Sequence, residues 1–364
     1  MKLAIPRETG DPRVALAPDA VKKLKEIGID VLLESEAGSG SFYADKDYEG
    51  ASVLGRSQLL SEADAVLSIH PLPAEEWPQL SSGSVVISEF KPFADDTITE
   101  RLEKAGFTAL SLDMIPRTTL AQSMDVLSSM ASIAGYKAAL EAARLLPRYF
   151  PMMITAAGSI RPATVLVLGA GVAGLQAIAT ARRLGAQVEA FDTRSAAKEE
   201  VKSLGAKFIE IEGAKDDKDA GGYAVEQSEE FLKRQREEVQ NRAMKADVII
   251  TTAQVRGRKA PLLVPKTTVA QMKPGSVIID LAASTGGNCE LTQDDQTVTY
   301  NQVRIVGNSN LASLMPQNAS QLYSNNVVNF LKLLVKDGAL NLDLSNEIIE
   351  GACIAGAPAA KENE

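Results

Sequence analysis

Short apolar runs alternate with helical stripes along the first third of the chain. The runs predict strands at residues 2–5, 30–34, 65–69, 84–88 and 107–112. Between the first two runs, Pro18 lies near the start of a helix that carries Val21 and Leu24 on its apolar face and ends at Gly28. Strands and helices that alternate at this spacing predict a parallel sheet with helices on both faces.

The alternation resumes after a long helical segment at residues 125–146, which ends before Pro147. The later apolar runs predict strands at residues 164–168, 187–191, 207–211, 247–251, 276–280 and 303–306. We therefore expect a second doubly wound sheet of the same kind.

A last helix is predicted over residues 317–335. It carries an apolar stripe at spacings of four, three and four residues, made of Tyr323, Val327, Phe330 and Leu334. Such a stripe must pack on something, and we expect it to return to the first sheet.

The predicted fold class is α/β, with two doubly wound domains built on parallel sheets. Domain 1 is expected to be discontinuous, with residues 1–130 plus 317–364, and domain 2 to span residues 131–316. Two long helices would join them around a cleft, where ligands tend to bind. Residues 163–181 are uncharged and long enough to span a bilayer, but their glycines favour a strand, a turn and a helix instead.

Composition excludes several classes of function. The chain has 364 residues and a net charge of −9, so a nucleic-acid partner is not expected. Its two cysteines, Cys289 and Cys353, support neither a disulfide framework nor a zinc cluster, and we expect no metal site. The single histidine, His70, excludes any mechanism that needs two. No signal peptide is expected at the start of the sequence.

The strongest local motif is the glycine-rich segment from Gly169 to Gly174, which has the form G-x-G-x-x-G. An apolar strand enters it and a helical segment leaves it, as dinucleotide binding requires. Gly169 would permit the tight turn, Gly171 would leave room for a pyrophosphate, and Gly174 would let the helix approach the strand. The phosphates would bind the free N–H groups at the start of the helix. Both domains are expected to be Rossmann-like because strands and helices alternate in each, and the motif lies in domain 2. A tight turn without any cofactor is the alternative interpretation of the motif.

An acidic residue follows at the expected distance. Asp192 ends the next predicted strand, 18 residues after Gly174. A carboxylate there would accept hydrogen bonds from the adenosine ribose and repel a 2′-phosphate, which favours NAD(H) over NADP(H). Arg194 leaves the other choice open, because an arginine nearby can accept that phosphate.

The same edge of the sheet should carry the ends of later strands. Ala253, Gln254 and Asp280 fall there, and each could equally have a packing role. No convincing acid–base pair emerges. His70, Lys91 and Asp280 are the candidates, although a histidine beside prolines is more typical of a structural residue. Hydride transfer between two nicotinamides would need no such pair.

The segment at residues 213–240 is highly charged and has two glycines in its middle. One interpretation is a solvated loop followed by an exposed helix. The other is a lid over a ligand, because lids make few buried contacts and use glycine hinges.

Taken together, these motifs make the chain resemble the NAD(H)-binding component of proton-translocating NAD(P) transhydrogenases, in particular the separate α1 chain of their three-subunit form. The resemblance covers essentially the whole sequence. Its landmarks are Ile5-Pro6-Arg7-Glu8, Met114-Ile115-Pro116-Arg117, Ala121-Gln122-Ser123-Met124-Asp125, Phe150-Pro151-Met152-Met153, the glycine segment, Lys273-Pro274-Gly275 and Gly286-Gly287-Asn288-Cys289.

The resemblance implies catalytic roles for Arg117, Gln122 and Asp125, in a loop that meets the nicotinamide end of NAD(H). Gln122 would hold the carboxamide or the ribose. Arg117 and Asp125 would pair and brace the loop, or Arg117 would contact the pyrophosphate; without the resemblance, Asp125 could equally be a helix cap. The implied nucleotide ligands are Gly169, Gly171, Val172, Gly174, Asp192, Thr193, Arg194, Gly222, Tyr223, Gln235, Ala253 and Gln254.

Further expectations come from the resemblance alone. Residues 213–230 would be a mobile loop that closes over the nucleotide, with Tyr223 at its tip. Position 254 is commonly leucine in the family, so the role of Gln254 stays open. NADP(H) would be bound by a partner β subunit, and a small membrane α2 subunit would complete proton translocation. The chain itself would be a homodimer in the cytoplasm, peripheral to the inner membrane and not inserted in it.

Two alternatives remain. Alanine dehydrogenases are related and use a lysine and a histidine; the lysine position falls on Ile69 or Ser68 here and the histidine position on Lys91, whereas their carboxylate-binding arginine is kept as Arg13. Such an enzyme would need Lys91 or His70 as a displaced acid–base. The other alternative is a non-catalytic NAD(H)-binding regulatory module.

Overall fold

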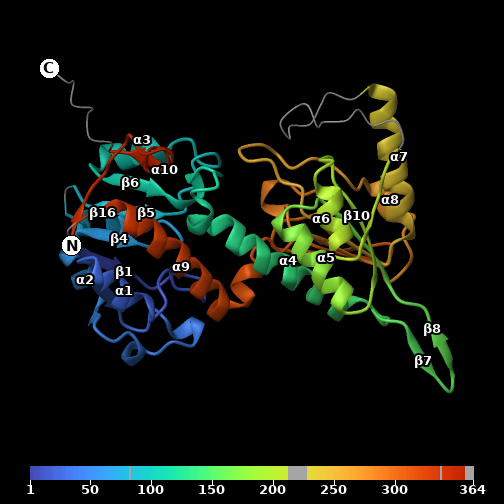
Figure 1. Ribbon diagram of the computed structural model, residues 1–364, viewed down its shortest axis with the longest axis horizontal. Helices are drawn as coiled ribbons and strands as arrows, with labels where there is room; N and C mark the ends of the chain where they lie inside the picture. The colour runs from blue at the N-terminus through green and yellow to red at the C-terminus, as the bar shows by residue number, and fades with distance from the viewer. Residues whose placement is uncertain (82, 212–227, 337, 357–364) are drawn as a thin grey trace. The chain divides into compact units, whose positions relative to one another are not determined.

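The structure is a computed structural model that describes residues 1–81, 83–211, 228–336 and 338–356. The chain divides into two compact units. Unit 1 consists of Met1–Met130 and Met315–Glu364, and unit 2 of Ala131–Leu314. Each unit is built on a seven-stranded sheet, with helices against its faces (Figure 1).

Unit 1 has the sheet order β18-β6-β5-β4-β1-β2-β3. Its strands are β1 (Lys2–Ile5), β2 (Asp30–Glu34), β3 (Ser52–Leu54), β4 (Ala65–Leu67), β5 (Val85–Ser88), β6 (Thr108–Ser111) and β18 (Cys353–Ala355). Six of them are parallel, in the 3-2-1-4-5-6 order of dinucleotide-binding folds. β18 is antiparallel to β6 and adds an edge strand that was not predicted.

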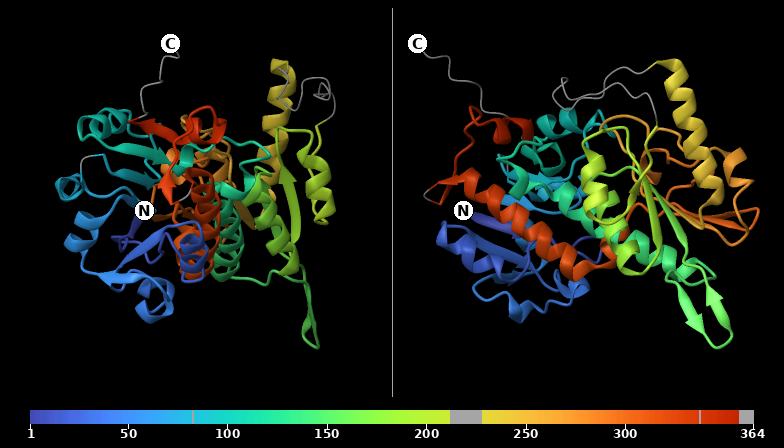
Figure 2. Two further views of the ribbon diagram at one scale, coloured as in Figure 1. Left: turned by 60° about the vertical axis from the view of Figure 1, so that its left-hand side comes forward. Right: turned by 45° about the vertical axis from the view of Figure 1, so that its right-hand side comes forward.

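The helices of unit 1 complete its core. They are α1 (Ala20–Glu26), α2 (Arg56–Glu62), α3 (Ile98–Lys104), α9 (Pro316–Leu334) and α10 (Glu347–Ala352). Tyr323 and Phe330 of α9 are fully buried in one cluster with Leu3 and Ile5 of β1. α9 therefore lies against this sheet and beside α1 (Figure 2). A small hairpin follows it, with β16 (Val335–Lys336) and β17 (Ala339–Leu340).

Unit 2 has the sheet order β11-β10-β9-β12-β13-β15-β14. Its strands are β9 (Thr164–Leu168), β10 (Gln187–Phe191), β11 (Lys207–Phe208), β12 (Val248–Thr251), β13 (Val277–Asp280), β14 (Thr297–Tyr300) and β15 (Val303–Val306). The parallel strands repeat the 3-2-1-4-5-6 order, and antiparallel β14 lies at the edge. The register aligns the final residues of the four central strands, namely Phe191, Leu168, Thr251 and Asp280, so the loops that follow start side by side.

Alternate residues of β9 serve the two faces of the second sheet. Val165 and Val167 pack with α5 (Val172–Arg183), whereas Leu166 and Leu168 pack with α7 (Glu229–Lys245). α4 (Val126–Leu145), α6 (Ala197–Ser203) and α8 (Lys266–Val269) complete the helices that lie wholly or partly in this unit. Residues 163–181 thus form a strand, a turn and most of a helix. Within the described ranges, no helix is long and apolar enough to cross a membrane.

A second hairpin was not predicted. β7 (Met153–Thr155) pairs with β8 (Gly158–Ile160) and extends away from the sheet of unit 2 (Figure 1). Its residues are three to a strand, too few for a visible alternation of apolar and polar positions.

Candidate functional site

The glycine turn after β9 is required in part by the packing of the chain itself. Gly169 has φ +102°, and a Cβ atom there would lie 2.5 Å from Oγ1 of Thr252. A Cβ atom on Gly174 would lie 1.9 Å from the carbonyl oxygen of Gly169. Both positions therefore need glycine with or without a ligand.

Gly171 is different. Its φ is −77°, which any residue adopts, and a Cβ atom there would meet no atom of the described residues within 4 Å. Neither backbone strain nor packing explains a glycine at this position. Gly171 is also the N-cap of α5, where no side chain caps the first N–H groups. An open space in front of uncapped helix N–H groups fits a pyrophosphate.

Asp192 lies beside this turn, directly after β10. Its carboxylate accepts hydrogen bonds from the N–H of Ala170 at 2.7 Å and from Arg194, whose Nε is 3.0 Å away. Burial alone would raise the pKa of Asp192, but these hydrogen bonds outweigh burial and lower it. The carboxylate is therefore ionised near neutral pH, in the form that accepts hydrogen bonds from ribose hydroxyls.

The loop after β12 faces the glycine turn. Oγ1 of Thr252 donates to the carbonyl oxygen of Gly169 at 3.1 Å. Ala253 follows and is held by the side chain of Asn288 on both its N–H and its carbonyl oxygen. Gln254 is exposed and donates from Nε2 to Leu281. Asn288 was only a landmark in the sequence; its contacts show that it shapes this loop.

Asp280 holds the backbone of a turn in this structure. It is fully buried, and its carboxylate accepts hydrogen bonds from five donors. These are Oγ1 of Thr251 and Thr292 and the N–H groups of Ala282, Asn288 and Cys289. These contacts hold the turn after β13, and the geometry lends no support to the prediction that Asp280 transfers a proton.

Other candidates are placed without being joined to this cluster. Val172 opens α5 and is 46% exposed, an apolar surface beside the turn. Thr193 lies between Asp192 and Arg194, and Gln235 is half-buried on α7. Gly222 and Tyr223 lie outside the described residues, as does most of the predicted lid.

Arg117, Gln122 and Asp125 belong to unit 1. Arg117 and Gln122 are exposed. Both carboxylate oxygens of Asp125 bind Ser128, one to its N–H at 2.9 Å and one to its hydroxyl at 2.6 Å, which caps α4. Among the described residues, no ion pair joins Asp125 to Arg117, so the predicted brace between them is not formed in this structure.

The carboxyl edge of the first sheet carries a buried ionic cluster. Asp11 accepts hydrogen bonds from Nη2 of Arg13 at 2.6 Å and lies 2.9 Å from Nε2 of His70. Burial would raise the pKa of Asp11, but the hydrogen bonds from His70 and Arg13 hold it well below its usual range. His70 therefore takes part in a structural pairing. The side chain of Lys91 is exposed, and its backbone N–H is 3.3 Å from Asp113.

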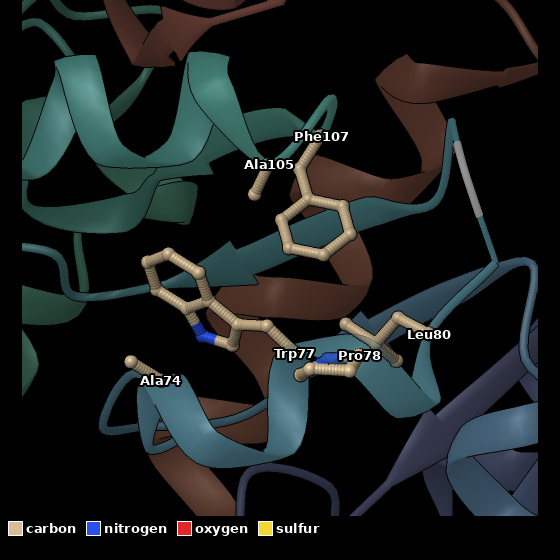
Figure 3. Close-up of a pocket in the computed structure, with 6 residues that line it drawn as sticks. All are labelled: Ala74, Trp77, Pro78, Leu80, Ala105 and Phe107. Carbon is tan, nitrogen blue, oxygen red and sulfur yellow. The ribbon is translucent and has the colours of Figure 1, made fainter.

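An apolar pocket of about 360 Å³ lies elsewhere in unit 1 (Figure 3). Its walls include Trp77 and Phe107, whose rings meet edge to face at 5.9 Å. It borders the amino end of β6, whereas ligands of open α/β sheets bind at carboxyl ends. Its lining has no ionisable side chain, so we assign it no chemistry. The described residues include no group of three or more metal-binding side chains.

The second sheet, with its glycine turn and neighbouring acidic residue, is that of a dinucleotide-binding α/β protein. The chain belongs to the alanine dehydrogenase/PNT family: the model of the family's N-terminal domain matches residues 4–134, and that of its C-terminal domain matches residues 138–359. The resemblance predicted from the motifs is thereby confirmed.

Named relatives place the chain within this family. It is 45% identical to an NAD(P) transhydrogenase subunit alpha chain of Rhodospirillum rubrum, over 97% of this chain and 96% of that one. The crystal structure of transhydrogenase from Sinorhizobium meliloti is 42% identical, with a TM-score of 0.89 over 97% of this chain and 98% of that one. An L-alanine dehydrogenase structure is 28% identical, with a TM-score of 0.74 over 91% and 89%. The chain is thus more similar to the transhydrogenases than to this alanine dehydrogenase.

Proposed function

We propose that this chain binds NAD(H) and exchanges a hydride with NADP(H) held on a partner subunit. The observation that carries the proposal is the space at Gly171, where the first N–H groups of the helix are uncapped and no described residue fills the gap. The names of its relatives, transhydrogenase alpha subunits, supply the reaction.

Each part of the second sheet's edge then has a task. The N–H groups at the start of α5 bind the pyrophosphate. Asp192 accepts hydrogen bonds from the adenosine ribose, and its charge favours NAD(H). The loop at Ala253 lies on the half of the sheet that receives the nicotinamide. The bound nicotinamide supplies the hydride, and because the acceptor is a second nicotinamide, the chain only has to orient the ring and exclude water.

In this proposal Arg117, Gln122 and Asp125 serve the reacting end of the nucleotide, and Gly222, Tyr223 and Gln235 belong to a segment that closes over it. Catalysis needs the NADP(H)-binding β subunit. A small membrane α2 subunit couples the reaction to proton translocation, and the chain acts as a homodimer in the cytoplasm, attached to the inner membrane through these partners.

Alanine dehydrogenase activity is the second candidate, supported by the 28% identical structure and by Arg13. Arg13 is 5% exposed and already engaged by Asp11, so it is not offered to a substrate carboxylate. We therefore favour the transhydrogenase.

The test mixes the purified chain with the isolated NADP(H)-binding domain of the partner and follows hydride transfer from NADH to NADP⁺. Transfer that needs both proteins is the expected result. NADH oxidation by the chain alone with pyruvate and ammonium would support alanine dehydrogenase instead. Tight NADH binding without either reaction would leave a regulatory module.

A further inference from the structure

The turn after β13 is hydrogen-bonded to the loop after β12 through the side chain of Asn288. Oδ1 of Asn288 accepts the N–H of Ala253 at 3.0 Å, and Nδ2 donates to the carbonyl oxygens of Ala253 and Pro261, both at 2.8 Å. The side chain is fully buried. One amide thus holds both backbone polar groups of a single residue.

Asn288 is itself held firmly. Its N–H donates to Asp280 at 2.8 Å, and its carbonyl oxygen accepts from the N–H groups of Leu263 and Val264. Gly286 and Gly287, with φ of +100° and +76°, make the turn that brings it there. An anchor with this many hydrogen bonds has one position, so Ala253 has one position too.

The loop after β12 is in turn hydrogen-bonded to the glycine turn. Thr252 precedes Ala253; its N–H donates to Leu168 and its Oγ1 to Gly169. The order of contacts therefore runs from Asp280 through Asn288 to the loop after β12, and from there to the residue that opens the nucleotide turn. All of these residues lie in unit 2.

The place of β12 in the sheet says which half of a dinucleotide this loop meets. In the 3-2-1-4-5-6 order, β9 is strand 1, β10 is strand 2 and β12 is strand 4. Strands 1 to 3 form one mononucleotide-binding half, and Asp192 after β10 marks it as the adenosine half. Strand 4 opens the other half, which receives the nicotinamide.

We propose that Asn288 is a positioning residue that fixes the backbone of Ala253 against the nicotinamide half of NAD(H). The proposal rests on the proposed function. It assigns Asn288 an effect on the reacting half of the nucleotide and little effect on the adenosine half.

Two variants and one control test it. Asn288→Ala removes all three side-chain hydrogen bonds. Asn288→Asp keeps the shape and the acceptor for Ala253 but loses both donations. The control is Gln240→Ala: this half-buried amide also binds backbone, donating to the carbonyl oxygen of Leu263 at 2.8 Å, but it contacts neither Thr252 nor Ala253.

The affinities for NADH and for AMP are measured by titration, and hydride transfer is measured with the partner's NADP(H)-binding domain. Losing buried hydrogen bonds to a loop that meets the ring should weaken NADH binding and lower kcat by about 10-fold each, with AMP affinity changed less than about 2-fold. Gln240→Ala should leave the ratio of NADH to AMP affinity at the wild-type value. Equal losses of NADH and AMP affinity, or none, would overturn the proposal.

Hydrogen exchange of the wild-type protein tests the same claim without a variant. The Ala253 N–H should exchange slowly before any nucleotide is added, because Asn288 already accepts it. Fast exchange would overturn the proposal even if both variants failed to fold. A wild-type chain that binds NADH but transfers no hydride would instead refute the proposed function and leave the NADH and AMP comparison intact.

Discussion

The parallel strands of the two sheets have the same order, but their carboxyl edges differ. A side chain of the protein occupies the ligand position in the first sheet, whereas a glycine turn lies there in the second. In unit 1, Glu8 follows β1, and its carboxylate accepts the N–H groups of Ile69 and His70 after β4, at 2.6 and 3.1 Å. β1 and β4 are the pair at which the strand order reverses, the place where open sheets bind ligands. The chain therefore places its own carboxyl group where a ligand would lie.

Unit 2 leaves the corresponding place free. Between β9 and β12 the chain offers Gly169 and Thr252, and next to them Gly171, where an added Cβ atom would contact none of the described residues. A sheet of this topology therefore offers a ligand site only where the chain's own side chains do not occupy the edge. At the strand pair where the order reverses, a glycine with neither a positive φ nor a close neighbour is the sign of such a place.

The largest effect on stability is expected at the carboxyl edge of the first sheet, which the chain fills with its own side chains. Asp11→Ala leaves Arg13 buried without its carboxylate and removes the partner of His70. Breaking a buried ion pair should lower the free energy of unfolding by about 3–5 kcal/mol. Urea denaturation measures it. The exposed Asp19–Lys23 pair is the control, and Asp19→Ala should cost less than about 1 kcal/mol.

The NADH affinity of the Asp11→Ala variant is measured in the same experiment. Because the nucleotide elements of unit 2 do not include Asp11, affinity should be unchanged in the folded variant. A marked loss of affinity in folded Asp11→Ala would contradict the division of labour between the two edges.

At the carboxyl edge of the second sheet, NADH affinity should depend on the size of the side chain at position 171. Gly171→Leu places a side chain in the space left for the pyrophosphate and should weaken NADH binding on the order of 100-fold, equivalent to about 2.8 kcal/mol. Stability should hardly change, because a Cβ there meets nothing. NADH titration and thermal unfolding measure the two quantities.

Gly55 is a close geometric match for Gly171 in unit 1. It too is the N-cap of a helix, with φ −77° and nothing within 4 Å of a Cβ. Gly55→Leu should keep full NADH affinity. Similar losses of affinity in both variants would mean that the space at Gly171 has no special role.

How much of this could be predicted from sequence depends on how local each feature is. The central strands and the glycine turn were predicted, because apolar runs and a six-residue motif are visible within a few positions. β3, β14 and β18 were missed, since edge strands of three or four residues, partly exposed, lack a clear pattern. The pairing of Asp11 with His70 joins residues 59 positions apart, so spacing could not reveal it.

The two roles of Asn288 and Asp280 show the same limit. Asp280 was recognised as a strand end, but a carboxylate that will be saturated by five donors looks identical in sequence to a free one. Only the turn at Gly286 and Gly287, closed in three dimensions, shows which it is.

A smaller effect is expected at the boundary of the open site. Asp192→Asn weakens its grip on Arg194 and removes the charge that repels a 2′-phosphate. NADH affinity should fall about 10-fold and NADPH affinity should rise relative to it. The double variant with Arg194→Gln should lose the gain for NADPH. An unchanged preference in Asp192→Asn would mean that this carboxylate does not select the nucleotide.

The smallest effect is expected on the pH dependence of stability, through a carboxyl group at the edge of the first sheet. Burial raises the pKa of Glu89; Lys91, Arg13 and His70 nearby oppose the rise, and Asp113 adds to it. A raised pKa in the folded state means that Glu89 binds its proton more tightly when folded. Its contribution to stability is therefore complete below the ordinary range of a carboxyl group and is lost as pH rises toward the folded pKa.

Glu89→Gln imitates the protonated form and should remove that loss. As pH rises above the ordinary range of a carboxyl group, the free energy of unfolding of Glu89→Gln should increase relative to that of the wild type. Asp11, with its lowered pKa, acts in the opposite direction, losing its contribution as pH falls, but it is present in both proteins and cancels in the difference. Glu49→Gln, at an exposed position of the same unit, should give a curve parallel to the wild type. If Glu89→Gln also runs parallel, the charge at this edge is balanced by its cationic neighbours, and the cost of filling a ligand site with the chain's own carboxylates is smaller than burial implies.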